Sequence, residues 1–267
     1  MNESRNPYAP PTAAVADTSH APGAETFIPN GRSVSVGNGA KWMTQAFRLF
    51  FQTPGKWILV GLIMFGLSFA SGLVPLGGVA LTVFWPVLIG GTMYAIHQQR
   101  TTGTFEIGTI FSGFGPRLGR LAAVGALLLL NIPLLILVFA VVLGGDIIRI
   151  MQMTGQEADP TGMFAEIGQK GLLAFLIYLL FLIPLVAATY LAPALIVLHD
   201  LRTGEAMKMS FIGLMKNILP GIVFGALMLI AFLISILPIG LGLLIMMPVG
   251  LITTYTMYRN IFVEEEE

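Results

Sequence analysis

The predicted fold of this chain follows from Phe47-Arg48-Leu49-Phe50 and Gly61, a pattern that occurs three times. The other two copies are Phe111-Ser112-Gly113-Phe114 with Gly125, and Phe211-Ile212-Gly213-Leu214 with Gly225. In every copy the glycine lies fourteen residues after the first phenylalanine. Each copy is an amphipathic stretch, then a break that contains proline, then a long apolar stretch. We therefore predict one membrane-embedded unit that is used three times.

The composition also indicates a membrane protein. Of the 267 residues 55% are hydrophobic and only 10% are charged, whereas soluble domains carry about 25% charged residues. Uncharged runs cover residues 57–96, 121–145, 171–198 and 217–258. A span needs about 20 residues, so the first and last runs must turn back. We predict an all-α integral membrane protein with six spans, at about 57–74, 78–96, 121–144, 171–198, 219–236 and 241–258.

The positive charges define the orientation. The net charge is zero, which gives no general attraction to nucleic acid. Ten basic residues flank the spans on one side: Lys41, Arg48, Lys56, Arg100, Arg117, Arg120, Arg202, Lys208, Lys216 and Arg259. The other side has only Arg149 and Lys170. Because Lys and Arg accumulate in cytoplasmic loops, we expect both termini in the cytoplasm.

The two ends of the chain differ from the apolar middle. Residues 1–37 are rich in Ala, Pro, Ser, Thr and Gly, so we predict a disordered cytoplasmic tail. Residues 38–263 form the predicted six-helix domain, with a polar external loop at 145–170. Residues 264–267 are all Glu, and we expect a solvated acidic tail.

Each unit begins with a stretch that has one apolar face. These faces consist of Trp42, Ala46, Leu49 and Phe50; of Ile107, Ile110, Phe111 and Phe114; and of Met207, Phe211, Leu214 and Ile218. Such helices lie flat in the headgroup layer, or they pack as cytoplasmic helices on the bundle. Because each unit crosses the membrane twice, the repeats share one orientation and are related by an axis along the membrane normal.

The exits of the second spans also correspond. His97 and Arg100 follow span two, His199 and Arg202 follow span four, and Tyr258-Arg259 follows span six. We expect a ring of these residues at the cytoplasmic boundary. Basic and aromatic residues there anchor helix ends, or they form a site for an anion or a lipid headgroup. Two histidines without a third soft ligand are too few for a metal site.

The spans themselves contain little chemistry. None has Asp, Glu, Lys, Arg or His in its interior, although ionisable groups are the usual functional residues within a membrane. The polar candidates are Asn131, Thr189 and Tyr190. Each joins helices by hydrogen bonds, or else contacts a solute. We therefore expect no enzyme and no cofactor.

One segment carries a family resemblance. Pro193-Ala194-Leu195, a short polar turn and Glu205-Ala206-x-Lys208-x-Ser210-Phe211 resemble uncharacterised bacterial inner-membrane proteins. The wider group includes YciC-like proteins and the membrane domain attached to some glycerophosphodiester phosphodiesterases. The resemblance covers about residues 38–262. It implies a fold and a bacterial inner-membrane location, but no reaction, since these 267 residues contain no hydrolase barrel.

Two functions remain open from the sequence. The first is a multi-pass protein without a catalytic site that binds membrane lipids, including anionic headgroups, or membrane-protein partners. The alternative is a facilitator or channel for a small neutral or amphiphilic solute. A continuous polar cavity lined by Asn131, Thr189 or Thr253 would favour the facilitator, and a tightly packed axis would favour lipid binding.

Overall fold

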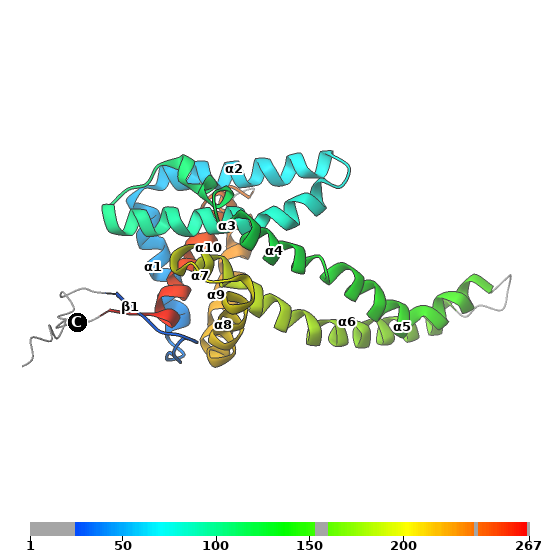
Figure 1. Ribbon diagram of the computed structural model, residues 1–267. Helices are drawn as coiled ribbons and strands as arrows, with labels where there is room; N and C mark the ends of the chain where they lie inside the picture. Colours follow the sequence, from blue (N-terminus) through cyan, green and yellow to red (C-terminus); the bar gives the residue numbers. More distant parts are fainter. Residues whose placement is uncertain (1–24, 153–159, 238–239, 266–267) are drawn as a thin grey trace, which may run out of the picture.

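The computed structural model describes residues 25–152, 160–237 and 240–265, and almost all of them are helical (Figure 1). The helices are α1 (Asn38–Gln52), α2 (Pro54–Leu73), α3 (Gly77–Thr102), the 3₁₀ helix η1 (Ile107–Phe114), α4 (Leu118–Leu128), α5 (Asn131–Gln152), α6 (Pro160–Tyr190), α7 (Ala192–His199), α8 (Thr203–Lys216), α9 (Ile218–Ile236) and α10 (Leu243–Phe262). Two short strands, β1 (Glu25–Phe27) and β2 (Val263–Glu265), pair antiparallel.

Long helical arms, formed by α2 with α3 and by α5 with α6, project from a base that contains α1, α7, α8 and α10 (Figure 1). In Figure 1, α2 lies along α3 and α5 lies along α6, while α7, α8 and α10 lie near the centre of the view and β1 lies at its left. Five stretches of the described chain are long and apolar enough to cross a membrane: Pro54–Leu73, Gly77–Thr102, Leu118–Asp146, Ile167–His199 and Ile218–Ile236. The structure therefore agrees with the prediction of an all-α, multi-pass membrane protein.

The sixth expected span, α10, differs from these five. Its second half contains Thr253-Thr254-Tyr255-Thr256 and Arg259, which lower its hydropathy. These side chains are buried because α10 is enclosed by α1, α2, α3 and α9. The hydroxyl of Thr256 donates to the carbonyl oxygen of Trp42 over 2.9 Å, which fixes α1 against the centre of the base.

The contacts between the three predicted units follow a cyclic order. The entry segment of each unit packs on the second helix of the preceding unit: α1 on α10, η1 on α3, and α8 on α6. Two of the recurring glycines lie at related contacts, between α2 and α10 and between α4 and α3. A Cβ on Gly125 would be 2.2 Å from the carbonyl oxygen of Val83, and a Cβ on Gly61 would be 3.3 Å from Pro248. Gly225 has open space around it, so its place in the pattern has no packing role in this structure.

Span three is broken rather than continuous. Residues 121–144 were expected to form one helix, but α4 ends at Leu128 and α5 begins at Asn131. Pro133 is the cause, because its ring excludes the carbonyl four residues earlier, that of Leu129, from a regular helix. The carbonyl of Leu129 accepts from the amide of Ile132 instead, over 3.1 Å.

Span four is broken at Leu191, where a side chain enters the helical hydrogen-bond ladder. The amide of Leu191 donates to Oγ of Ser210 over 3.0 Å, and that hydroxyl donates to the carbonyl oxygen of Ala187 over 2.6 Å. A regular helix would join Leu191 directly to Ala187. Inserted groups of this kind kink helices, and Pro193 prevents the helix from continuing unchanged. Ser210 therefore docks α8 onto the junction of α6 and α7.

The loop that the sequence predicts at 145–170 is shorter than expected. Helix α5 continues to Gln152 and α6 begins at Pro160, so most of the polar segment 145–170 is helical, and residues 153–159 lie outside the described part. Nζ of Lys170 bonds to both carboxylate oxygens of Asp146, over 2.8 and 2.9 Å. This ion pair joins the two helices near the far end of their arm.

The structure describes part of both predicted tails. Residues 25–34, here called the N-terminal strap, form β1 and a turn at Asn30-Gly31, where φ is 63° and 65°. Asn217 holds the strap by accepting from the amide of Val34 and donating to the carbonyl of Arg32, both over 2.8 Å. Glu264 and Glu265 pair with the strap in β2. Only residues 1–24 and 266–267 of the expected tails lie outside the described residues.

Candidate anion-binding site

The C-terminal part of α10 contacts His97 near the end of α3 and His199 at the end of α7. Nδ1 of His97, on α3, lies 3.1 Å from the hydroxyl of Tyr255, and Nε2 of His199, on α7, lies 2.5 Å from the hydroxyl of Tyr258. The rings of the two tyrosines are 5.9 Å apart. Phe27 of the strap stacks on His199 with ring centres 3.9 Å apart. These contacts form one aromatic and polar cluster at the base.

Two arginines of the expected ring meet at a carboxylate from the strap. Nη1 of Arg100 and Nη1 of Arg259 both contact Oε1 of Glu25, the latter over 3.2 Å. The Arg259 side chain is only 10% exposed. Because guanidinium groups bind oxyanions strongly when they are shielded from water, this pair is an anion site that the strap already occupies.

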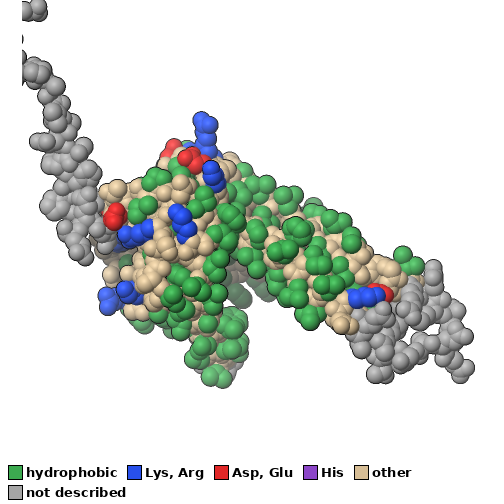
Figure 2. All heavy atoms as spheres, turned by 90° about the horizontal axis from the view of Figure 1, so that it is seen from below, with side chains coloured by type: hydrophobic (Ala, Val, Ile, Leu, Met, Phe, Trp, Pro, Cys, Tyr) green, Lys and Arg blue, Asp and Glu red, His purple; other side chains and the backbone are tan. Residues whose placement is uncertain are grey.

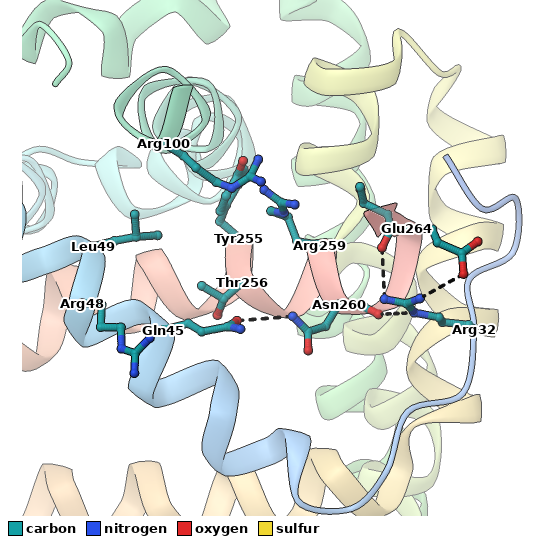
Figure 3. A pocket seen from close by; sticks show the side chains of 11 residues that line it. Arg32, Gln45, Arg48, Leu49, Arg100, Tyr255, Thr256, Arg259, Asn260 and Glu264 are labelled. Atoms are coloured by element: carbon teal, nitrogen blue, oxygen red, sulfur yellow. Dashed lines mark hydrogen bonds and ion pairs between the residues drawn. The ribbon is translucent and has the colours of Figure 1, made fainter. Parts of the chain in front are cut away.

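An open pocket of about 710 Å³ lies beside this pair (Figure 3). It is lined by Arg32, Gln45, Arg48, Leu49, Arg100, Tyr255, Thr256, Arg259, Asn260, Val263 and Glu264. Figure 3 shows that α1, α3 and α10 carry most of these side chains and that Arg100 and Arg259 approach each other. The pocket thus combines four arginines with amide and hydroxyl groups, a lining suited to oxyanions.

Positively charged side chains are frequent in the lining of the pocket. Arg32 pairs with Glu264 over 3.6 Å, and Glu25 serves both Arg100 and Arg259. Arg48 forms no ion pair with a residue that the structure describes. The described residues that line the pocket thus include four arginines and one carboxylate, that of Glu264.

The structure brings together most, but not all, of the ring expected from the sequence. His97, Arg100, His199, Tyr258 and Arg259 gather around α10. Arg202 does not join them. It precedes α8 as an exposed residue, and its side chain forms no hydrogen bond or ion pair within the described part of the chain.

The sequence did not point to the other pocket residues. Arg32 and Glu25 fall within the predicted disordered tail, and Arg48 was identified only as one of the basic residues that flank the spans. The missed signal is Asn30-Gly31 after the β-prone residues 26–28, a dipeptide typical of tight turns with positive φ. That turn brings the strap back along the end of α10, where the amide of Arg32 bonds to the carbonyl of Ile261 over 2.8 Å.

The apolar faces of the entry segments point partly into the protein. In α1, Trp42, Ala46 and Phe50 are fully buried, while Phe51 is 65% exposed. The main apolar face of α1 therefore packs on the base, as in the alternative of a packed cytoplasmic helix.

The other two entry segments keep aromatic residues on the surface. In η1 the exposed fractions of Phe111 and Phe114 are 41% and 43%. In α8 the buried residues are Ala206, Ser210 and Gly213, whereas Phe211 of the predicted apolar face is 36% exposed. These aromatic side chains are free to contact lipid.

The polar residues within the spans bond inside the protein. Oδ1 of Asn131 accepts from the Tyr178 hydroxyl and so joins α5 to α6. The hydroxyl of Thr189 donates to the carbonyl of Leu185 in its own helix over 2.9 Å. Tyr190 accepts from Thr254 of α10 over 3.2 Å. None of Asn131, Thr189 and Tyr190 lines the arginine pocket.

A second cluster of charges holds the connection between α7 and α8. Oδ1 of Asp200 accepts from Nη2 of Arg120 over 2.9 Å and from Nε of Arg117 over 3.0 Å. These hydrogen bonds, that of Arg120 first, lower the pKa of the Asp200 carboxyl. Asp200 has φ of 56° and ends α7, so this cluster is a structural clamp.

Among the described residues no metal-binding group helps to identify the pocket, and no similar protein does so. Within the described residues, no group of three His, Asp or Glu side chains could hold a metal ion. No protein-family model, curated protein or solved structure matches the chain. The geometry of the base is therefore the basis for assigning a function.

Proposed function

We propose that this chain is a six-span protein of the bacterial inner membrane, with both termini in the cytoplasm. Its role is to bind anionic lipid headgroups at its cytoplasmic end, without catalysis. The observation that carries this proposal is the pocket lined by four arginines. Figure 2 shows most of the visible Lys and Arg side chains on one part of the molecule and hydrophobic side chains along the arms.

The arrangement of the helices supports the six spans. The pairs α2–α3, α4/α5–α6/α7 and α9–α10 each follow an entry segment, and each entry segment packs on the preceding pair in cyclic order. A proline inside the second helix of every pair, Pro86, Pro184 and Pro248, is a further correspondence. We propose that α10 crosses the membrane shielded by its neighbours, so that its threonines do not face lipid.

The surroundings of the pocket support a lipid ligand. Arg48 lines the pocket, and Phe51, one turn further along α1, is 65% exposed. A cation next to an exposed aromatic residue is the arrangement found at headgroup depth. The same helix thus offers charge to a phosphate and apolar surface to the acyl chains. No observation favours the facilitator, because the polar groups expected to line its path bond within the protein.

Binding of the full-length protein, purified in detergent, to vesicles that contain phosphatidylglycerol tests this proposal. Each Lys or Arg near an anionic surface contributes about 1 kcal/mol. The double variant Arg48→Gln/Arg259→Gln should therefore bind roughly 30-fold more weakly, since every 1.4 kcal/mol is a tenfold change. Tryptophan fluorescence checks its fold, and Arg48→Gln alone is a second variant that leaves the buried arginine in place.

The matched control is Lys41→Gln/Lys208→Gln, which removes two exposed charges outside the pocket at the same end of the molecule. It should lose far less affinity than the arginine variant. An equal loss in the two variants would show diffuse attraction and refute the pocket as the site.

The orientation is tested with reporter fusions. Fusions at Asn38, Gly103, Gln156 and Glu267 should lie inside, inside, outside and inside, as the distribution of Lys and Arg predicts. Gln156 and Glu267 lie outside the described residues, but they probe the connecting segment and the C-terminus. An external signal at Gly103 would contradict six spans.

A further inference from the structure

We propose that the lipid headgroup bound in the arginine pocket ends in a polyol, as in phosphatidylglycerol, and that Gln45 and Asn260 recognise its hydroxyl groups. This inference rests on the function proposed above and names the class of headgroup that the same site takes. It starts from two amide side chains that face each other in the lining of the pocket, Gln45 on α1 and Asn260 on α10 (Figure 3).

The amide pair offers both donors and an acceptor to a ligand. Nδ2 of Asn260 donates to Oε1 of Gln45 over 3.3 Å, which is longer than the usual distance of about 2.7–3.2 Å. Nε2 of Gln45 and Oδ1 of Asn260 form no hydrogen bond within the part of the chain that the structure describes. Because an amide side chain has two N–H donors and one carbonyl acceptor, the donors of Gln45 and the acceptor of Asn260 are available to a ligand.

A polyol matches this pair because a hydroxyl group both donates and accepts hydrogen bonds. One hydroxyl can donate to Oδ1 of Asn260 while the same hydroxyl, or its neighbour, accepts from Nε2 of Gln45. An ionised phosphate oxygen only accepts, and an ammonium group only donates, so neither of them satisfies both amides. The adjacent hydroxyls of a glycerol group supply both roles.

Arg48 places the phosphate of the same headgroup next to the polyol. Gln45 and Arg48 are three residues apart on α1 and both line the pocket. Side chains at this spacing on a helix are neighbours, with about 5–6 Å between their Cβ atoms. A phosphate that contacts the guanidinium of Arg48 therefore brings the next atoms of its headgroup to Gln45. An ammonium group at that place, as in ethanolamine or serine headgroups, would be repelled by Arg48.

The pocket has room for more than a phosphate. Its volume is about 710 Å³, within the range of about 300–1,000 Å³ for pockets that hold whole small molecules. Leu49 adds an apolar side chain to the lining, and Phe51, two residues further along α1, is 65% exposed. Helix α1 thus provides polar groups for the headgroup and an apolar surface beside them for the acyl chains.

Binding of three probes to the full-length protein in detergent tests this inference. Dihexanoyl phosphatidylglycerol and dihexanoyl phosphatidylmethanol carry the same charge on a phosphodiester, but only the first has hydroxyls on its headgroup. Glycerophosphoglycerol lacks the acyl chains, and so separates a lipid from a free polyol phosphate. The wild type should bind phosphatidylglycerol about tenfold more tightly than phosphatidylmethanol, because the hydroxyls add two hydrogen bonds. Glycerophosphoglycerol should bind more weakly than phosphatidylglycerol.

Variants of similar size assign the recognition to the two amides. Gln45→Met and Asn260→Leu remove the amide groups and keep the volume of the side chains. Together they should lower the affinity for phosphatidylglycerol about tenfold. The affinity for phosphatidylmethanol should stay as in the wild type, which also shows that the pocket is intact. Gln169→Met makes the same change at an exposed position on α6, outside the pocket, and should keep the preference of the wild type.

Each contrary result has a separate meaning. If the wild type binds phosphatidylglycerol and phosphatidylmethanol equally, or if the double variant keeps the preference, the recognition of a polyol is refuted while the proposed function stands. An equal loss of both lipids in the double variant would show that the amides support the pocket without recognising hydroxyls, and would also refute the inference. Glycerophosphoglycerol that binds as tightly as phosphatidylglycerol would refute the lipid source. If neither lipid binds the wild type, the proposed function itself fails.

Discussion

Replacement of Ser210 by alanine should loosen the docking of α8 onto the break between α6 and α7. The hydroxyl of Ser210 is fully buried, accepts from the amide of Leu191 and donates to the carbonyl of Ala187. Alanine removes both bonds and adds no atoms. Because Pro193 keeps the helix from closing regularly, the two backbone groups are left without good partners.

The magnitude follows from these two bonds. A hydrogen bond contributes about 0.5–1.5 kcal/mol net, and a buried group left unpaired costs about 1–3 kcal/mol. Partial relaxation of the junction brings the expected loss for Ser210→Ala to about 2 kcal/mol. Ser235→Ala is the matched control, because Ser235 is also buried but donates only to the carbonyl of Ala231 in its own helix, over 2.7 Å. That carbonyl also has its helical partner, so we expect a loss of about 0.5 kcal/mol or less.

Amide hydrogen exchange of the reconstituted protein measures this difference. A loss of about 2 kcal/mol in local opening corresponds to roughly 30-fold faster exchange of the Leu191 amide. The segment that contains Ser235 should exchange almost as in the wild type in its own variant. If both variants accelerate exchange to the same extent, the inserted hydroxyl does not hold the junction, and the reasoning is refuted.

Three further predictions concern the strap, the arms and the base. Gly31→Val should detach the strap and expose it to protease, because φ is +65° at Gly31 and an added Cβ would lie 2.6 Å from a side chain of α10. Gly37→Val should not expose the strap, because Gly37 has open space around it. Asn131→Leu should lower stability by only about 0.6 kcal/mol in a membrane, and a severe loss of folded protein by gel filtration would contradict this. Asp200→Asn should lower the thermal midpoint at neutral pH, where the wild-type carboxylate is ionised. The hydrogen bond from Arg120 lowers the pKa of the Asp200 carboxyl in the folded state. The difference in thermal midpoint between wild type and variant should therefore shrink as pH falls below about 4. A difference that persists unchanged at pH 3 would show that the charge of Asp200 is not involved.

Some of the candidate site could be predicted from the sequence because it lies within one turn of helix ends. His97, Arg100, His199 and Arg259 follow long apolar runs, and the length of a membrane span places such residues at one boundary. Arg202 follows the same rule but lies outside the cluster, because the left-handed turn at Asp200 redirects the chain before it. Sequence spacing predicts depth along the membrane normal, but not direction within the plane.

The interruptions of the spans were only half predictable. The turns near 74–78 and 237–240 follow from the length of the runs and their Pro and Gly residues. Pro133 and Pro193 also lie in the sequence, yet membrane helices tolerate proline when neighbours satisfy the freed backbone groups. Whether a helix breaks there depends on a distant partner, and for Leu191 that partner is the hydroxyl of Ser210.

The sequence by itself determined the helical class, the apolar stretches and the concentration of positive charge at one end, because burial in lipid requires long uncharged segments. Only the tertiary structure decided that α10 is enclosed by its neighbours and that the strap returns to place Glu25 between Arg100 and Arg259. The physical reason is one of distance along the chain. Hydropathy is a local property of about 20 residues, whereas Glu25 and Arg259 meet because a left-handed turn at Asn30-Gly31 and the fold of the base bring opposite ends of the chain together.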